Sequence, residues 1–402
     1  MMFFQAEEGG LHLNHDETNR YLNCLDALLS SREVLDQYSR DSVSRFMQTV
    51  ILSALDLRKR RQEKVFGIRL AQALDALRSV LEAPPRSWSV FMPVDGLAPD
   101  ALPQRFGNVE FCAVDDPRLR QPFQTLVDTP DQGADRNGGW VRALVSGIDD
   151  RLADLPVALA EVQAGDSETA LCLARRNLRL ALDVLNFYAD LLYPPRFRVA
   201  VRPAEERPPR LALSVVADRG RSEASVPHET VGPLRPLSFE DVRSSTYREL
   251  GIERAGQLLA NRKGSDLDEL LLSALQWAGR ATVEPRPEVA FLHYAIALES
   301  IMLGPDPTPE LSYRLRMRTA WVLGNEVKKR KGIADAVGRL YAIRSSIVHS
   351  GRCEVAESDV QLMRSLAKTS IVAILTRSPF AEMQRYRELN TWFHEAMLGA
   401  SF

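Results

Sequence analysis

One segment constrains the fold of this chain more than any other. The stretch PEVAFLHYAIALESIML, residues 287–303, places apolar side chains nearly all the way round a helix, with Pro287 at its start and Gly304 just after its end. A helix with this pattern is stable in water only when other elements cover it on every side. The segment therefore predicts the central, buried helix of a bundle.

The rest of the second half carries the same kind of pattern. Apolar residues recur at helical spacing, and the interruptions contain Gly or Pro, as expected between helices. We expect helices over residues 239–260, 265–282, 287–303, 310–326, 333–350, 355–377 and 380–398. Residues 236–402 are therefore predicted to form an all-α helical bundle.

The first half mixes helical and strand-like patterns. Residues 16–82 and 167–193 have helical spacing, and each of these stretches stops at a Pro-Pro pair. Strand-like runs occupy residues 88–94, 108–114, 196–202 and 210–216, while residues 140–147 suit either a strand or the start of a helix. The segment 218–238, rich in Gly, Ser and Pro, is the best boundary. We predict an α+β chain with a mixed α/β domain over 1–235 and the bundle over 236–402.

Composition excludes several classes of protein. Four cysteines lie far apart, which speaks against a disulfide framework or a thiolate zinc site. The start, MMFFQAEEGG, lacks basic residues, and the chain contains no run of about twenty apolar residues. We therefore expect a cytoplasmic protein that does not contact a membrane. The net charge of -2 gives no overall attraction to a polyanion, so nucleic-acid binding requires local clustering of cations.

The central helix carries one acid. Glu299 shares its stripe with apolar residues, namely Leu292, Ile296 and Leu303. A buried carboxylate without a partner is costly, so we expect Glu299 to pair with Arg344, with Arg314 or His349 as alternatives. The competing interpretation is that Glu299 lies near the end of the buried strip and reaches water.

Arg344 and His349 lie in the segment RSSIVHSG, residues 344–351, at the end of a predicted helix. A helical wheel places Leu340, Ile343 and Ile347 on the core side. Tyr341, Arg344, Ser345, Val348 and His349 fall on a neighbouring surface, with Gly351 just past the helix end.

This surface suits phosphate chemistry on RNA. An imidazole accepts or donates a proton near neutral pH, and a guanidinium holds two phosphoryl oxygens. The adjacent 2′-hydroxyl of RNA serves as the nucleophile, so neither metal nor cofactor is required. Two copies meeting across a two-fold axis would bring four such groups together. The simpler interpretation is a helix-terminal His that interacts with the macrodipole beside a solvated Arg.

Cations cluster around this segment. Residues 314–352 hold ten basic side chains and two acidic ones, a net charge of +8 in a chain whose total is -2. A solvated helix face usually interleaves acids at four-residue spacing, and here they are scarce. We expect RNA contacts from this cluster and from the nearby aromatic ring, namely Lys328, Lys329, Arg330, Lys331, Arg314, Arg318 and Tyr341.

These residues carry a resemblance to a known family. FLHYAIALES, a basic helix pair and LYAIRSSIVHSG together resemble the Apea-like branch of the HEPN superfamily, whose signature is Arg, four to six residues, then His. The resemblance covers roughly residues 240–400. The first half is less specifically similar to the α/β region that precedes this domain in such proteins, through FMPVDGL, FGNVEF and ARRNLRLALDVLNFY.

The resemblance implies a metal-independent endoribonuclease that acts as a homodimer, commonly a toxin or antiphage effector. Arg344 and His349 take the signature positions, Glu299 takes that of an acid on a preceding helix, and Ser345 stands where Asn is common. The N-terminal domain would sense a protein or a phage-derived trigger. Some family members persist as non-catalytic modules, so the alternative is a module that binds RNA, a nucleotide or a protein partner.

Other chemistries find little support. The chain lacks a Gly-rich phosphate loop, a G-x-S-x-G elbow and a His-Glu-x-x-His motif. His12 and His15 lie three residues apart, where a metal pair is conceivable but an incidental pair is the better interpretation. We expect no metal and no cofactor.

Overall fold

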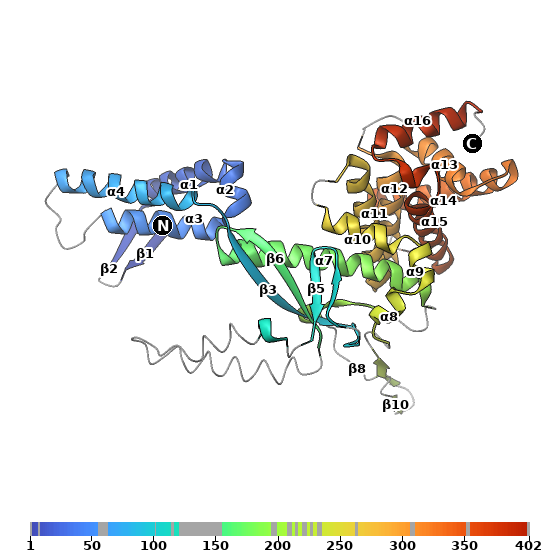
Figure 1. Cartoon of the computed structure of the whole chain (residues 1–402), viewed down its shortest axis with the longest axis horizontal. Helices are drawn as coiled ribbons and strands as arrows, with labels where there is room; N and C mark the ends of the chain where they lie inside the picture. The colour runs from blue at the N-terminus through green and yellow to red at the C-terminus, as the bar shows by residue number, and fades with distance from the viewer. Residues whose placement is uncertain are drawn as a thin grey trace. The chain divides into compact units, whose positions relative to one another are not determined.

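The computed structural model has the expected α+β class, with a small antiparallel sheet in the N-terminal part and helices beyond it (Figure 1). It describes residues 2–6, 9–54, 63–100, 102–113, 116–119, 155–193, 199–206, 211–213, 216–218, 223–225, 228–230, 235–261, 264–305, 310–350 and 354–399. Residues 140–147, for which we predicted a strand or a helix start, lie outside these ranges.

The chain divides into two compact units. Unit 1 comprises Met1–Val90 with Ala160–Arg176, and unit 2 comprises Phe91–Leu159 with Asn177–Phe402. The expected boundary between residues 235 and 236 falls inside unit 2. That boundary came from composition alone, whereas the units follow contacts between segments far apart in sequence.

The N-terminal segment of unit 1 contains a hairpin and, in place of the continuous helical pattern expected over residues 16–82, four helices among its described residues. Their bounds are β1 Met2–Ala6, β2 Gly9–Leu13, α1 His15–Leu29, α2 Arg32–Gln37, α3 Arg40–Ala54 and α4 Glu63–Leu81. Asn14 and Glu17 form a capping box at the start of α1, which satisfies backbone N–H groups that the helix leaves free. The buried core of this unit includes Tyr21, Leu25, Tyr38 and Val43.

A five-stranded sheet follows in the order β4-β5-β6-β3-β7. Its strands are β3 Arg86–Asp95, β4 Gln104–Phe106, β5 Val109–Cys112, β6 Val157–Ala164 and β7 Arg202–Pro203. The strands predicted over 88–94 and 108–114 are confirmed as β3 and β5. Within the described residues of the runs at 196–202 and 210–216, the strands are β7, β8 Leu211–Leu213 and β9 Val216–Asp218. The latter two pair with β11 His228–Thr230 and β10 Glu223–Ser225, respectively.

The helical bundle of unit 2 is organised around α12, Pro287–Leu303. Phe291, Leu298, Ile301 and Met302 are fully buried, and α12 contacts α11, α13, α14 and α15. The prediction of a central buried helix is therefore confirmed. The other helices of this region are α8 Phe239–Val242, α9 Ser245–Glu249, α10 Ile252–Ala260, α11 Asp266–Val283, α13 Leu311–Leu323, α14 Val327–Ser350, α15 Glu357–Thr376 and α16 Tyr386–Met397, with the 3-10 turns Ala204–Glu206 and Phe380–Glu382.

Two predicted helix boundaries were wrong. The stretch 239–260 is three short helices. The first break falls at Ser244, whose backbone is not helical, and the second falls at Gly251, which adopts a left-handed conformation with φ of 84° that a continuous helix excludes. Conversely, Gly332 does not separate two helices, since α14 starts at Val327 and runs through it. A solvent-facing Gly weakens a helix by about 1 kcal/mol relative to Ala, which the rest of a 24-residue helix outweighs.

The helix α7, Ser167–Leu192, confirms the pattern predicted over 167–193, and its residues from 177 onward belong to unit 2. Gly279 of α11 packs against the α7 backbone so closely that a Cβ there would lie 1.8 Å from the carbonyl oxygen of Asp183. Arg280 then reaches the Asp183 carboxylate at 2.9 Å. Because burial outweighs this pairing, the pKa of Asp183 rises to about 6.

A second buried contact ties α7 to α15. The Lys368 ammonium is 2% exposed and lies 2.5 Å from Asp190, and it donates to the carbonyl oxygen of Phe187 and the hydroxyl of Thr282. Arg364 donates to Asp190 at 2.6 Å. Burial lowers the pKa of Lys368 to about 8 even though Asp190 opposes the shift. The bundle of unit 2 thus includes an α7 segment that we had assigned to the preceding domain.

We expect Asp190→Leu to destabilise the protein by about 3–5 kcal/mol, because it leaves Lys368 buried without its counter-ion. Adding Lys368→Met should recover part of that loss, since it removes the buried ammonium while Arg364 still lacks Asp190. Urea unfolding measures both changes. Glu206→Gln, which removes the exposed partner of Arg179 on α7, should have little effect. Equal loss in the single and double variants would contradict this account.

Among the described residues, none of the helices is both long enough and apolar enough to span a membrane.

Candidate functional site

The last two turns of α14 extend beyond the part of that helix that is packed. Ala334, Val337 and Leu340 are buried, whereas no described residue of α14 after Leu340 is buried, and Val348 is 51% exposed. Our wheel placed Ile343 and Ile347 in the core, and this was wrong, because both are only half-buried. The end of α14 is therefore a surface rather than part of the core.

Arg344 and Glu299 form the ion pair that the sequence predicted. Arg344 Nε lies 3.1 Å from Glu299 Oε1, and Arg344 Nη2 donates to Glu299 Oε2 at 3.3 Å. The shorter contact, between Nε and Oε1, is not aligned as a hydrogen bond. The pair is therefore looser than a bidentate arginine–carboxylate pair with two parallel hydrogen bonds. The side chains are 25% and 20% exposed, which leaves both at the edge of the bundle.

The surroundings of Glu299 favour its neutral form. Burial raises the pKa of this carboxyl above its ordinary value, and the Arg344 charge and hydrogen bond lower it only part of the way back. Arg344 thus opposes the effect of burial on the pKa of this carboxyl. In return, Glu299 restricts the orientation of the guanidinium.

His349 lies near the end of α14 and is exposed. Five residues separate it from Arg344, which corresponds to about 140° of rotation and about 7.5 Å of rise. Ser345 is half-buried and lies about 40° from His349 around the helix axis. One chain therefore presents the imidazole and the guanidinium on different sides of the helix. Gly351, the predicted residue after the helix end, lies outside the described residues.

Apolar side chains are exposed on both α13 and α14. Val348 continues the α14 stripe that contains Val337, Tyr341 and Arg344. At the start of α13, Leu311 is 40% exposed and Tyr313 is 53% exposed. Tyr341 itself is half-buried, so its ring contributes both to the edge of the core and to the surface.

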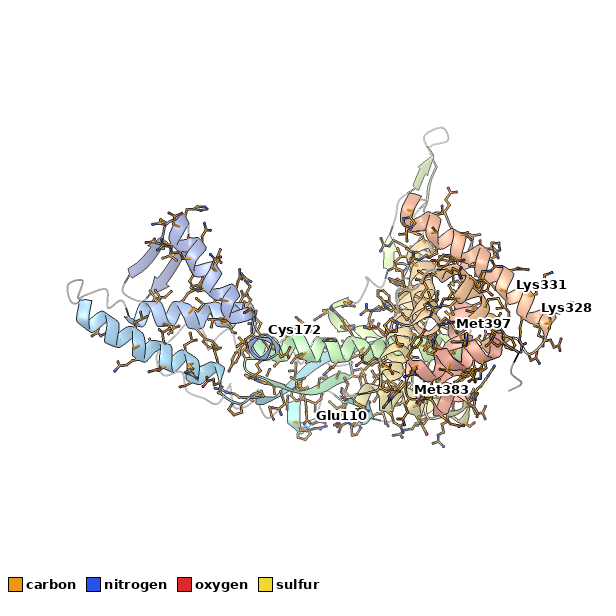
Figure 2. The ribbon with its side chains drawn as sticks, turned by 90° about the horizontal axis from the view of Figure 1, so that it is seen from above. Glu110, Cys172, Lys328, Lys331, Met383 and Met397 are labelled. Atoms are coloured by element: carbon orange, nitrogen blue, oxygen red, sulfur yellow. The ribbon has the colours of Figure 1, made fainter. Side chains whose placement is uncertain are left out.

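Three of the predicted RNA-binding lysines are exposed at the opposite end of α14. Lys328, Lys329 and Lys331 form its first turn, and in the described part of the chain none of them has an ion-pair partner. Figure 2 shows Lys328 and Lys331 at the tip of the bundle. Cations at a helix N-terminus oppose the macrodipole, so this arrangement costs stability unless an anion offsets it.

Two of the residues predicted to contact RNA make contacts within the bundle. Arg318 is 4% exposed and donates to the carbonyl oxygen of Met302 and to the Tyr386 hydroxyl, so it holds the bundle together and cannot meet RNA. Arg330 donates to the carbonyl oxygen of Gly324 at 2.9 Å, and its guanidinium carbon lies 3.4 Å from the centre of the Trp321 ring. The prediction for Arg318 was therefore wrong, whereas Arg330 is partly exposed and stays a predicted RNA contact.

Other cations of the basic segment are neutralised by acids. Arg316 pairs with Asp335 at 3.5 Å, and Arg339 pairs with Asp359. Asp359 lies outside the 314–352 window, so the sequence count overstated the free positive charge. Arg314 is half-buried, and it has no ion-pair partner among the described residues. It remains a candidate, whereas Arg352 lies outside the described ranges.

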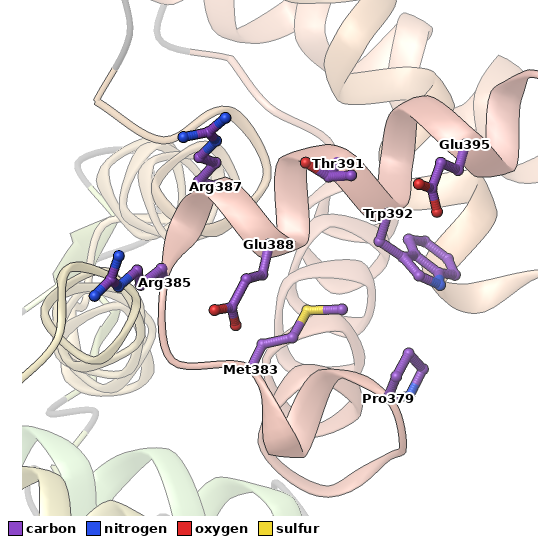
Figure 3. A pocket seen from close by; sticks show the side chains of 8 residues that line it. All are labelled: Pro379, Met383, Arg385, Arg387, Glu388, Thr391, Trp392 and Glu395. Atoms are coloured by element: carbon purple, nitrogen blue, oxygen red, sulfur yellow. The ribbon is translucent and has the colours of Figure 1, made fainter.

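An open pocket of about 480 Å³ lies beside α16, away from all of the predicted site residues in sequence (Figure 3). Its lining consists of Pro379, Met383, Arg385, Arg387, Glu388, Thr391, Trp392 and Glu395. It contains no histidine or cysteine, so it offers none of the acid-base chemistry proposed for α14.

The described residues do not gather three or more His, Cys, Asp or Glu side chains in an arrangement that could hold a metal ion. His15 begins α1. The side chain of His12, its proposed companion, lies outside those described.

Comparison with known proteins adds no identification. No protein-family model matches the chain. No curated protein matches it significantly, and no solved structure does so either.

We expect Arg344→Met to make stability more sensitive to pH. The folded-state pKa of Glu299 is raised, so at pH values above the ordinary pKa of this carboxyl the folded protein binds more protons than the unfolded chain does. The free energy of unfolding therefore falls as the pH rises through the range between the two pKa values. Loss of Arg344 raises this pKa further, so the fall between pH 5 and pH 7 should grow by on the order of 1 kcal/mol. Chemical unfolding at the two pH values measures it.

Arg344→Met combined with Glu299→Gln is the matched control, since it removes the titrating group and should remove the extra pH dependence. If Arg344→Met showed the same pH dependence of stability as the wild type, Arg344 would not influence the pKa of Glu299.

Proposed function

We propose that this protein is a metal-independent endoribonuclease of the HEPN type, and that the end of α14 is its active surface. The observation that carries the proposal is that the end of α14 presents an exposed His349 and, five residues before it, an Arg344 that Glu299 of α12 holds in an ion pair. A catalytic group at a helix end that the bundle leaves open can reach a macromolecular substrate. A purely structural ion pair would require no accessible imidazole nearby.

In this proposal His349 moves the protons. The 2′-oxygen of the RNA attacks the adjacent phosphorus, its proton passes to a basic group, and the bond from phosphorus to the 5′-oxygen breaks as that oxygen gains a proton. Arg344 stabilises the charge that develops on the phosphoryl oxygens. Glu299 is a positioning residue that orients Arg344, and the Ser345 hydroxyl is a hydrogen-bond donor on the His349 side of the helix.

The separation of the two groups favours a composite site. Because Arg344 and His349 lie about 140° apart around the helix, one phosphate cannot readily meet both on a single chain. A two-fold axis near Val348 would place Arg344 of one subunit beside His349 of the other. Exposed Leu311, Tyr313 and Val348 supply apolar area for such a homodimer.

The remaining cations are assigned to RNA binding. Lys328, Lys329, Arg330, Lys331 and Arg314 would contact phosphates, and Tyr341 would contact a base. We further propose a cytoplasmic toxin or antiphage effector whose N-terminal part senses a protein or phage-derived trigger. That role follows from the family resemblance, and no described residue of the N-terminal part identifies the trigger.

The alternative is a non-catalytic module that binds RNA, a nucleotide or a protein. One observation favours it, since Glu299 already neutralises Arg344 and reduces its net attraction for phosphate. Cleavage by the purified protein separates the two proposals.

We expect His349→Ala to lower RNA cleavage by about two to four orders of magnitude, because general acid-base catalysis contributes that much. Arg344→Lys should also produce a large defect, since lysine keeps the charge but loses the planar fork. Gel analysis of a labelled RNA measures cleavage. His394→Ala on α16 is the matched control and should cleave like the wild type.

Both catalytic-site variants should retain most of their RNA affinity, because the lysines supply the non-specific attraction. Wild-type protein that binds RNA without cutting it would support the binding module instead.

We expect the wild-type protein to be a homodimer by light scattering at micromolar concentration. Val348→Asp should shift it to a monomer, because a two-fold axis would bring two like charges close together in an apolar contact. Leu398→Asp, a change to another exposed apolar side chain, should leave the dimer intact. A monomeric wild type would contradict this assembly.

A further inference from the structure

Lys331, near the start of α14, and His349, near its end, lie on the same face of the helix. His349 lies 18 residues after Lys331, which is five whole turns, so both side chains project from the same side of the helix about 27 Å apart. Both are exposed. A ligand that lies straight along this face would meet the imidazole at one end and the lysine at the other.

The α14 side chains between them are small. Gly338, Ala342 and Ser345 lie within about 40° of the line from Lys331 to His349, and all are small. Asp335 is the one acid near that line, and Arg316 pairs with it at 3.5 Å. Arg316 also lies over Gly338, where a Cβ would be 2.9 Å from its Nε atom. The middle of the face therefore has small α14 side chains and little negative charge, and Arg316 from α13 places a cation across it at Gly338.

The cations at the far end are available to a ligand. Lys328 lies about 60° from Lys331 around the helix, and neither has an ion-pair partner in the part of the chain that the structure describes. Arg339, on the same helix, is instead paired with Asp359. Phosphates gain most from cations that are not already neutralised.

We propose that single-stranded RNA binds along this face, from His349 toward the lysines. We call the face the α14 track and define it by Lys328, Lys331, Gly338, Ala342, Ser345 and His349. This inference rests on the proposed function for the position of the cleaved bond. A single row of contacts about 27 Å long suits one strand occupying at least roughly four nucleotides. Duplex RNA is recognised across grooves that span about 16 base pairs.

The track makes substrate length matter on one side of the cleaved bond. RNAs that carry one cleavable step can be extended from zero to eight nucleotides on the 5′ side or on the 3′ side. We expect kcat/KM and affinity to rise about tenfold as one of the two sides reaches roughly four nucleotides, and then to level off. Fluorescence anisotropy on the same RNAs measures affinity separately from cleavage.

Two variants test the path itself. Lys328→Gln with Lys331→Gln should remove most of the gain from extension and reduce the salt dependence, with the slope of log affinity against log salt falling by about 1.4 for two lost phosphate contacts. Ala342→Trp, which places a bulky ring in the middle of the track, should also reduce that gain. Arg339→Gln removes one positive charge from the same helix at a neutralised position, and it should behave like the wild type.

The outcomes separate this inference from the proposed function. Cleavage that does not depend on length, or a lysine variant that changes no more than Arg339→Gln, would overturn the track and leave the ribonuclease standing. An absence of cleavage of every RNA would overturn the ribonuclease. In that case, the track would still be supported if affinity rose with RNA length and the lysine and Ala342→Trp variants abolished that rise. Affinity that depended neither on RNA length nor on these variants would overturn the track.

Discussion

The burial of α12 is the constraint from which the rest of the second unit follows. A helix apolar on nearly every side requires neighbours all round, and α11, α13, α14 and α15 supply them. Near its end this helix carries Glu299, whose carboxylate is costly to bury alone. Arg344 meets that charge from α14. The ion pair therefore sets the orientation of Arg344 and links the exposed end of α14 to the core.

The same principle of paired burial places α7 in the bundle. Asp183 and Asp190 each meet a cation from the bundle, and Lys368 is almost fully enclosed. Buried ion pairs contribute little net stability compared with apolar packing. Loss of one partner, however, strongly destabilises the protein because the other charge stays buried alone. These contacts therefore specify how α7 packs. They also make it part of the unit that carries the proposed site.

Much of this organisation could be predicted from local pattern. The all-round apolar stretch predicted α12, alternation predicted β3 and β5, and the cost of a buried acid predicted the partner of Glu299. Each of these depends on periodicity or on the chemistry of one group. The break expected at Gly332 was wrong because a single unfavourable residue does not decide a long helix.

What the sequence could not supply was the tertiary environment of its cations. Arg318 and Arg330 look like surface charges in a basic segment, but one is buried and the other stacks on Trp321. A Trp nine residues before Arg330 was the only available signal for that contact. The partner of Arg339 lies twenty residues further along, and the α7 contacts join segments more than ninety residues apart.

The chemistry of the RNA ends tests the central claim most directly. Purified wild-type protein should be incubated with total RNA in EDTA, and both termini at each new break should be identified by sequencing. Attack by the 2′-hydroxyl predicts fragments with a 2′,3′-cyclic phosphate on one side and a free 5′-hydroxyl on the other, with no loss of activity in the chelator. Breaks that leave 5′-phosphates, or that require added magnesium, would contradict the account.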